Sequence, residues 1–266
     1  MADRGAATGL VLDGGVMFAA IDEWLAITGR SSPEVEPGSP LVGDARKSPD
    51  LQVAHAAWNG ITHAVDHLHA VRSLLGDARV LHPYAPYTLL RSAIENAATA
   101  VWLLAPPQRS ERLRRRLKLA RHEAWESGQV RKLVPAEVFE GRRTAEERIA
   151  EIRSLAIALG LDPNDVCGQF GYESVVRQAG EATKLGGDLS ALMWRLCSGL
   201  THGRYWASLS FLQREEMART TEAGVLDVRL TTDVDQVLTV VQVPFTFTNA
   251  ALQLYDQRRR SPYGAA

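Results

Sequence analysis

Apolar side chains recur at helical spacing along most of the chain, in blocks that end at glycine or proline. These blocks cover residues 16–28, 50–75, 86–104, 110–133, 146–159, 173–185, 188–200 and 233–260. Apolar positions three and four residues apart are typical of amphipathic helices. Only residues 225–230 alternate apolar and polar side chains, which predicts a strand. The pattern therefore predicts an all-α fold, a helical bundle with a small β-hairpin near residues 217–231.

The stretch from residue 31 to 49 interrupts this pattern because it holds four prolines and two glycines. Residues of these types favour loops over regular elements. We therefore expect an N-terminal helix with a proline-rich linker over 1–49 and a helical bundle domain over 50–266. Residues 162–171 also look irregular, and the helix that begins at 188 can continue past Gly203 towards Leu212.

Charge and composition exclude several classes of protein. The chain has 30 basic and 31 acidic residues, a formal charge of −1, so no global field attracts nucleic acid or membrane. Its two cysteines cannot form a disulfide framework. Residues 237–255 carry no charge, but their threonines and amides suit a helix buried in protein better than one in lipid. We expect a cytoplasmic protein with no membrane partner.

Two charged residues stand beside the apolar stripe of the helix over 87–104. Arg91 and Glu95 are four residues apart and so share one face. Near the bundle interior such a pair needs further partners, because an unpaired buried charge is costly. The pair either fixes the register of the helix or lines a functional polar pocket.

A second set of residues shares one face of the helix that begins at residue 188. It comprises Arg195, Ser198, Gly199, His202 and Trp206. Arg195 and His202 are about two turns, or roughly 10 Å, apart along the helix axis. Glycine costs about 1 kcal/mol in a helix. We therefore expect Ser198 and Gly199 to form a notch that admits another helix, a second subunit or a ligand.

An arginine and a histidine on one face suit chemistry at phosphate. Histidine has an ordinary pKa near about 6.5 and can exchange a proton at neutral pH. Arginine offers a permanently charged planar fork to phosphate oxygens. With a 2′-hydroxyl as nucleophile, Arg195 and His202 could cleave RNA without a metal. The alternative is that His202 caps its helix beside Gly203.

The segment Arg195-Leu-Cys-Ser-Gly-Leu-Thr-His202 resembles the arginine–histidine motif of HEPN-like proteins, and Leu90-Arg91-Ser-Ala-Ile-Glu95-Asn96 resembles an upstream helix of uncharacterised bacterial members. The resemblance spans about residues 50–212. It implies a metal-independent endoribonuclease of toxin–antitoxin or phage-defence type, with no cofactor, in a homodimer that a small antitoxin-like protein could bind. Arg195 and His202 would be catalytic and Arg91 and Glu95 supporting. Leu196 departs from the motif, which often has a polar residue there.

The segment 109–143 is the most basic part of the chain. It holds eleven basic and five acidic residues, a net charge of +6. Four cations of this segment could hold an RNA backbone: Arg114, Arg115, Lys118 and Arg121. Ser198 and Gly199 are further candidate substrate-binding residues. The alternative is a solvated face rich in arginine through codon bias, because 26 of the 30 basic residues are arginines.

Two further classes of function stay open. One is a non-catalytic helical module that binds RNA, a nucleotide or a protein. The other is a metal-binding bundle, because His63 and His67 are four residues apart and His202 or Glu95 could complete a site. Cys197 points about 140° away from His202 round the helix, so we expect it to be a core residue rather than a nucleophile.

Overall fold

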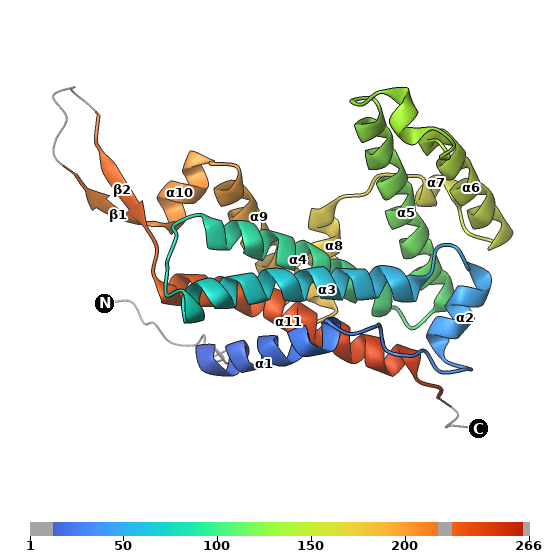
Figure 1. The fold of residues 1–266 in the computed structure, drawn as a ribbon, viewed down its shortest axis with the longest axis horizontal. Coiled ribbons are helices and arrows are strands. Elements are labelled where there is room, and N and C mark those ends of the chain that lie inside the picture. Colours follow the sequence, from blue (N-terminus) through green and yellow to red (C-terminus); the bar gives the residue numbers. More distant parts are fainter. Residues whose placement is uncertain (1–12, 218–224, 263–266) are drawn as a thin grey trace.

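The computed structural model describes residues 13–217 and 225–262, which form eleven α-helices and one two-stranded sheet (Figure 1). The larger helices are α1 (Gly14–Thr28), α3 (Val53–Arg72), α4 (Ala85–Leu104), α5 (Arg109–Arg131), α6 (Ala145–Ala158), α8 (Tyr172–Glu181), α9 (Gly187–Thr201) and α11 (Val234–Arg259). The shorter elements are α2 (Pro40–Lys47), α7 (Pro163–Val166), α10 (Tyr205–Phe211), β1 (Gln213–Glu216) and β2 (Val228–Thr231), with a π-helical turn over Ser73–Asp77 and a 3-10 turn over Ala136–Phe139. The prediction of a helical bundle with a small hairpin is confirmed.

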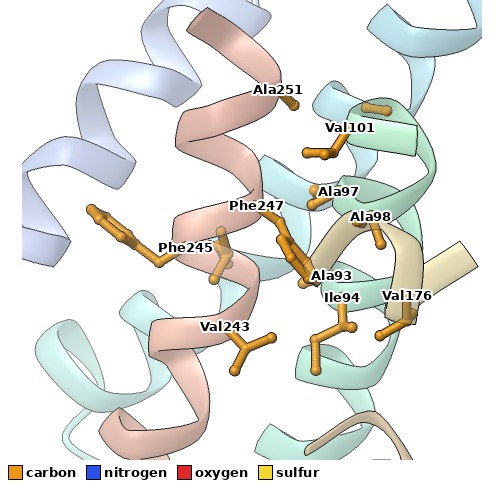
Figure 2. Close-up of a cluster of buried hydrophobic side chains, with 14 of the residues drawn as sticks. Ala93, Ile94, Ala97, Ala98, Val101, Val176, Val243, Phe245, Phe247 and Ala251 are labelled. Carbon is orange, nitrogen blue, oxygen red and sulfur yellow. The ribbon is translucent and has the colours of Figure 1, made fainter. Parts of the chain in front are cut away.

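Helix α4 lies at the centre of the bundle. It packs against α3 and α11 on one side and against α8 and α9 on the other (Figure 1). The predicted core stripe of α4 is fully buried, at Leu90, Ile94, Ala97, Val101 and Leu104. Small side chains let the helices approach, and Phe247 of α11 points towards α4 at this level (Figure 2).

Helix α11 is the one described helix that is long and apolar enough to cross a membrane, judged by length and composition. Half of its apolar window is buried inside the protein, as in a core helix. A capping box of Asp233 and Gln236 begins the helix. Thr246 and Thr248 donate their hydroxyl groups to carbonyls one turn earlier. The hydroxyl groups of these two threonines are therefore satisfied within the helix itself.

The proline-rich stretch 31–49 contains helix α2, although the sequence predicts a linker there. Ser39 caps α2 and Pro40 occupies its first turn, a favourable arrangement at a helix start. Helix α1 buries Met17, Ile21 and Trp24 in the main core. Both parts of the predicted N-terminal segment that the structure describes thus pack on the bundle. Helix α7 likewise lies within 162–171, predicted to be irregular.

The helix predicted to continue from residue 188 towards 212 breaks instead. Helix α9 ends at Thr201, Gly203 adopts a left-handed φ of 62°, and α10 starts after Arg204. The chain then forms β1, which begins before the predicted hairpin and pairs antiparallel with β2. Residues 218–224 of the predicted hairpin lie outside the described residues.

Helices α5, α6 and α7 form an arm that projects from the bundle (Figure 1). The arm has a core of its own, made of Leu117, Ala120, Ile152, Ala156 and Val166. The N-terminal half of α5 also packs against α2, α3 and α4. Helix α5 thus links the two cores, and its many arginines lie where the arm joins the bundle.

Candidate functional site

The predicted arginine–histidine face lies where α9 meets α10. Arg195 and Ser198 project from the last two turns of α9, and His202 is the residue that ends the helix. The backbone N–H of His202 donates to the Ser198 carbonyl, and that of Arg204 to the Gly199 carbonyl, at 2.8 Å. His202 thus ends its helix, as one interpretation predicted, and lines the same pocket as Arg195, whereas its role in chemistry stays a prediction.

These residues line one open pocket of about 300 Å³, named here the α9–α10 pocket. Its lining residues are Glu173, Trp194, Arg195, Ser198, Gly199, His202, Arg204 and Trp206. The structure thus brings Arg195 and His202 to one cavity, with Ser198 and Gly199 between them. The sequence interpretation missed the residues supplied by α8 and by the α9–α10 turn.

Gly199 forms a notch, as expected, and helix α10 of the same chain occupies it. A Cβ at Gly199 would lie 2.6 Å from the Cβ of Ala207 and 2.7 Å from the ring of Trp206. Distances this short do not occur between ordinary side chains, so glycine is needed for α10 to pack here. Of the three occupants that the sequence allowed, the structure places a helix at Gly199.

Arg195 has an acidic partner in the pocket. Its Nε lies 3.0 Å and its Nη2 2.5 Å from the two carboxylate oxygens of Glu173, the second residue of α8. The pair is bidentate, a strong geometry for arginine and carboxylate. Arg177 adds a second cation 3.8 Å from the same carboxylate. The Arg195 side chain is still 61% exposed, so solvent and ligands can reach it.

His202 and Arg204 have no such partner. Both are exposed, and within the described residues no hydrogen bond or ion pair holds either side chain. The exposed rings of Tyr205 and Trp206 follow directly in the chain. The pocket therefore presents a histidine, an uncompensated arginine and aromatic surfaces suited to stacking against bases.

The second predicted pair, Arg91 and Glu95, is held in a small polar network between α4 and α9. Arg91 Nη2 lies 3.1 Å from Glu95 Oε1, and the same oxygen accepts a hydrogen bond of 2.8 Å from the indole of Trp194. Their side chains are 27% and 17% exposed. Trp194 is thus the further partner that burial requires, and it connects the pair to the α9–α10 pocket.

The candidate cations on α5 have acidic neighbours. Arg114 and Arg115 both donate to Glu111, and Asp165 of α7 accepts from Arg114 at 2.6 Å and from Lys118 at 2.8 Å. These contacts lower the pKa of Asp165, first through Lys118 and then through Arg114. Arg114 and Lys118 thus join α5 to α7, and Arg115, which also donates to the Trp102 carbonyl, joins α5 to α4. All three cations have partners and are less available to RNA than the sequence suggests. Arg121 is half-buried, and its Nε has no partner among the described residues.

The other candidate reactive residues, Cys197, His63 and His67, do not form a site in the part of the chain that the structure describes. Cys197 is fully buried, and burial raises the pKa of its thiol to about 12, as expected for a core residue. His67 Nδ1 lies 2.8 Å from the carbonyl oxygen of His63. Within the described residues, no three side chains of His, Cys, Asp or Glu gather where they could hold a metal ion.

Comparison of the chain with protein-family models, curated proteins and solved structures finds no match. The resemblance to HEPN-like proteins therefore rests on the motifs alone. It stays a prediction, as do the homodimer and the antitoxin-like partner.

Proposed function

We propose that the protein binds single-stranded RNA at the α9–α10 pocket and cleaves it without a metal ion. One observation carries the proposal, that Arg195 and His202 line the same open cavity. Arg204 adds a second arginine, and Trp206 adds a ring beside it. A phosphate, a proton acceptor and a base-stacking surface can thus meet in about 300 Å³.

The reaction assigned to the pocket is transesterification within RNA. His202 takes the proton of a 2′-hydroxyl, the 2′-oxygen bonds to phosphorus, and the bond from phosphorus to the 5′-oxygen breaks. The departing 5′-oxygen takes a proton from water. Arg195 and Arg204 stabilise the charge on the phosphorane oxygens. The products are a 2′,3′-cyclic phosphate and a 5′-hydroxyl, and DNA is not cleaved.

The test is an assay with a labelled RNA oligonucleotide in EDTA. We expect cleavage by the wild type and losses of at least about 100-fold in rate for His202→Ala, the scale of a lost general base. His82→Ala is the matched control, because His82 is exposed outside the pocket. Intact RNA with the wild type, or equal rates for the two histidine variants, would refute the nuclease.

A specific observation favours a second function, RNA binding without cleavage. Glu173 neutralises Arg195 through both carboxylate oxygens, which weakens the arginine as a stabiliser of phosphorane charge. Under this alternative Glu173→Gln binds RNA more tightly than the wild type, because it frees a cation for phosphate. Fluorescence anisotropy over a range of salt measures the effect, and His202→Ala then binds as the wild type does.

A further inference from the structure

An open groove of about 490 Å³ lies between α3, α4, α5 and the start of α8, apart from the α9–α10 pocket. On its α3 side, His55, Asn59 and His63 follow at four-residue spacing and so share one face. Asn96 and Thr99 of α4 line another wall. This wall and the α3 side are thus rich in polar hydrogen-bonding groups.

The wall contributed by α5 carries a buried charge, Arg116, whose side chain is only 11% exposed. Its Nε is buried without a hydrogen-bond partner among the described residues. Its Nη1 lies 3.4 Å from an oxygen of Glu123, a carboxylate that is 50% exposed. Burial lowers the pKa of Arg116, and the nearby charge of Arg148 acts in the same direction. The guanidinium is therefore desolvated and incompletely compensated.

Arg112, one turn earlier on α5, shows what a fully compensated arginine is like in this fold. Its side chain is 2% exposed and donates to both oxygens of Asp44, at 2.7 and 2.8 Å. It also donates to the carbonyls of Pro106 and Pro107. Arg112 thus makes four hydrogen bonds, whereas Arg116 makes one long contact, to Glu123.

Two further groups face the groove with hydrogen-bonding capacity to spare. Tyr172, the first residue of α8, packs its ring edge-on against Phe170 at 5.3 Å, and no hydrogen bond within the described residues engages its hydroxyl. Asn96 donates one hydrogen bond, to the carbonyl of Ser92, and a primary amide offers more donors and acceptors than this uses. A ligand in the groove would therefore find both charge and polar partners.

We propose that this groove binds a small organic oxyanion, with a phosphate or carboxylate group against Arg116 and uncharged polar atoms against Asn59, Asn96 and Tyr172. The planar fork of arginine matches either oxyanion. The volume lies within the usual range of small-molecule sites. The site stands independently of RNA cleavage, because it uses none of the residues assigned to that reaction.

The test follows the melting temperature of the full chain during titration with sodium phosphate, sodium acetate or adenosine 5′-monophosphate at constant ionic strength. A ligand that binds only the folded state raises Tm with concentration. A saturable rise with phosphate and the nucleotide assigns a phosphorylated ligand, and one with acetate alone assigns a carboxylate. No rise with any of the three overturns the proposal.

Arg116→Met removes the charge and keeps an apolar stem. We expect it to weaken the binding seen in the wild type at least tenfold, whereas Arg153→Met, an exposed arginine on α6, binds as the wild type does. Equal binding by Arg116→Met and the wild type, or an equal loss in Arg153→Met, overturns the proposal. Asn59→Leu, which obstructs the groove without changing charge, must also weaken binding of the nucleotide. His202→Ala must bind normally, which separates this site from the nuclease.

Discussion

Arg112 and Arg116 lie four residues apart on α5, and both side chains are withdrawn from solvent. Arg112 makes four hydrogen bonds to Asp44 and to two carbonyls, whereas Arg116 has one long contact to Glu123. Removing one partner of a buried, fully bonded pair destabilises a fold strongly, whereas a buried charge with few partners is already incompletely compensated. The difference teaches that partners, rather than burial or residue type, separate a structural arginine from a candidate ligand-binding one.

Arg91 on α4 falls between these two cases. It contacts Glu95 at 3.1 Å, but its Nε is buried without a partner among the described residues. Glu95 is compensated better than Arg91, because it also accepts from Trp194. The three arginines therefore differ in how fully their charge is compensated, in the order Arg112, Arg91, Arg116. We expect the loss in the free energy of unfolding on substitution to decrease in the same order.

The largest effect is expected from Arg112→Met. The substitution leaves Asp44, which is fully buried, with Arg109 at 3.4 Å as its one remaining ion pair among the described residues. We expect a loss of about 3–5 kcal/mol in the free energy of unfolding, as for other broken buried pairs. Urea denaturation measures the loss. A loss below about 1 kcal/mol would contradict the interpretation of Arg112 as a structural arginine.

Arg91→Met should have an intermediate effect. It removes an ion pair but leaves Glu95 hydrogen-bonded to Trp194. The expected loss is about 1–2 kcal/mol. The same urea titration tests it, with Arg91→Lys as a control that keeps the charge. If Arg91→Met costs as much as Arg112→Met, the number of partners does not determine stability here.

Arg116→Met should change stability least of the three. The contact that it removes joins Arg116 to a half-exposed carboxylate. The methionine also removes the buried charge of Arg116, so the cost of desolvating that charge disappears. We expect a cost below about 1 kcal/mol without ligand. A loss above about 2 kcal/mol would show that Glu123 compensates Arg116 more fully than the single long contact indicates.

The smallest effect concerns the acid stability of the arm. Hydrogen bonds from Lys118 and Arg114 lower the pKa of Asp165, and those from Arg114 and Arg115 lower the pKa of Glu111. A carboxyl whose pKa is lower in the folded state stabilises at neutral pH, and this contribution disappears as pH falls through the ordinary range towards the lowered pKa.

The arm should therefore lose stability progressively below about pH 5. Urea denaturation followed by circular dichroism at a series of pH values measures this loss. Asp165→Asn is the control, because it should lose part of the pH dependence. An unchanged slope in that variant would mean that Asp165 does not couple to folding.

The helices themselves could be predicted from sequence because their signals are local. The apolar stripe of α4 and the start of α11 at Asp233 agree with prediction for this reason. Helix α2 was missed although Ser39 and Pro40 form a favourable helix start. The prolines around this short helix obscured the signal, and its contacts are non-local, such as that of Asp44 with Arg112, 68 positions later.

The candidate site could be predicted only in part. Helical spacing places Arg195 and His202 on one side, and the structure brings both to one pocket. Spacing cannot reveal that Glu173, 22 residues earlier, neutralises Arg195. Nor can it separate Arg112 from Arg116, which stand among similar residues on one helix. Such differences come from contacts between elements distant in sequence.

The contact at Gly199 also determines how this chain can vary over evolutionary time. Any side chain at that position must displace both Ala207 and the ring of Trp206. Substitutions at these three positions should therefore occur together in descendants of this sequence, as a covarying unit. A descendant that loses the glycine alone can keep the bundle, but α10 must then pack differently against α9, beside the pocket that Arg195 and His202 line.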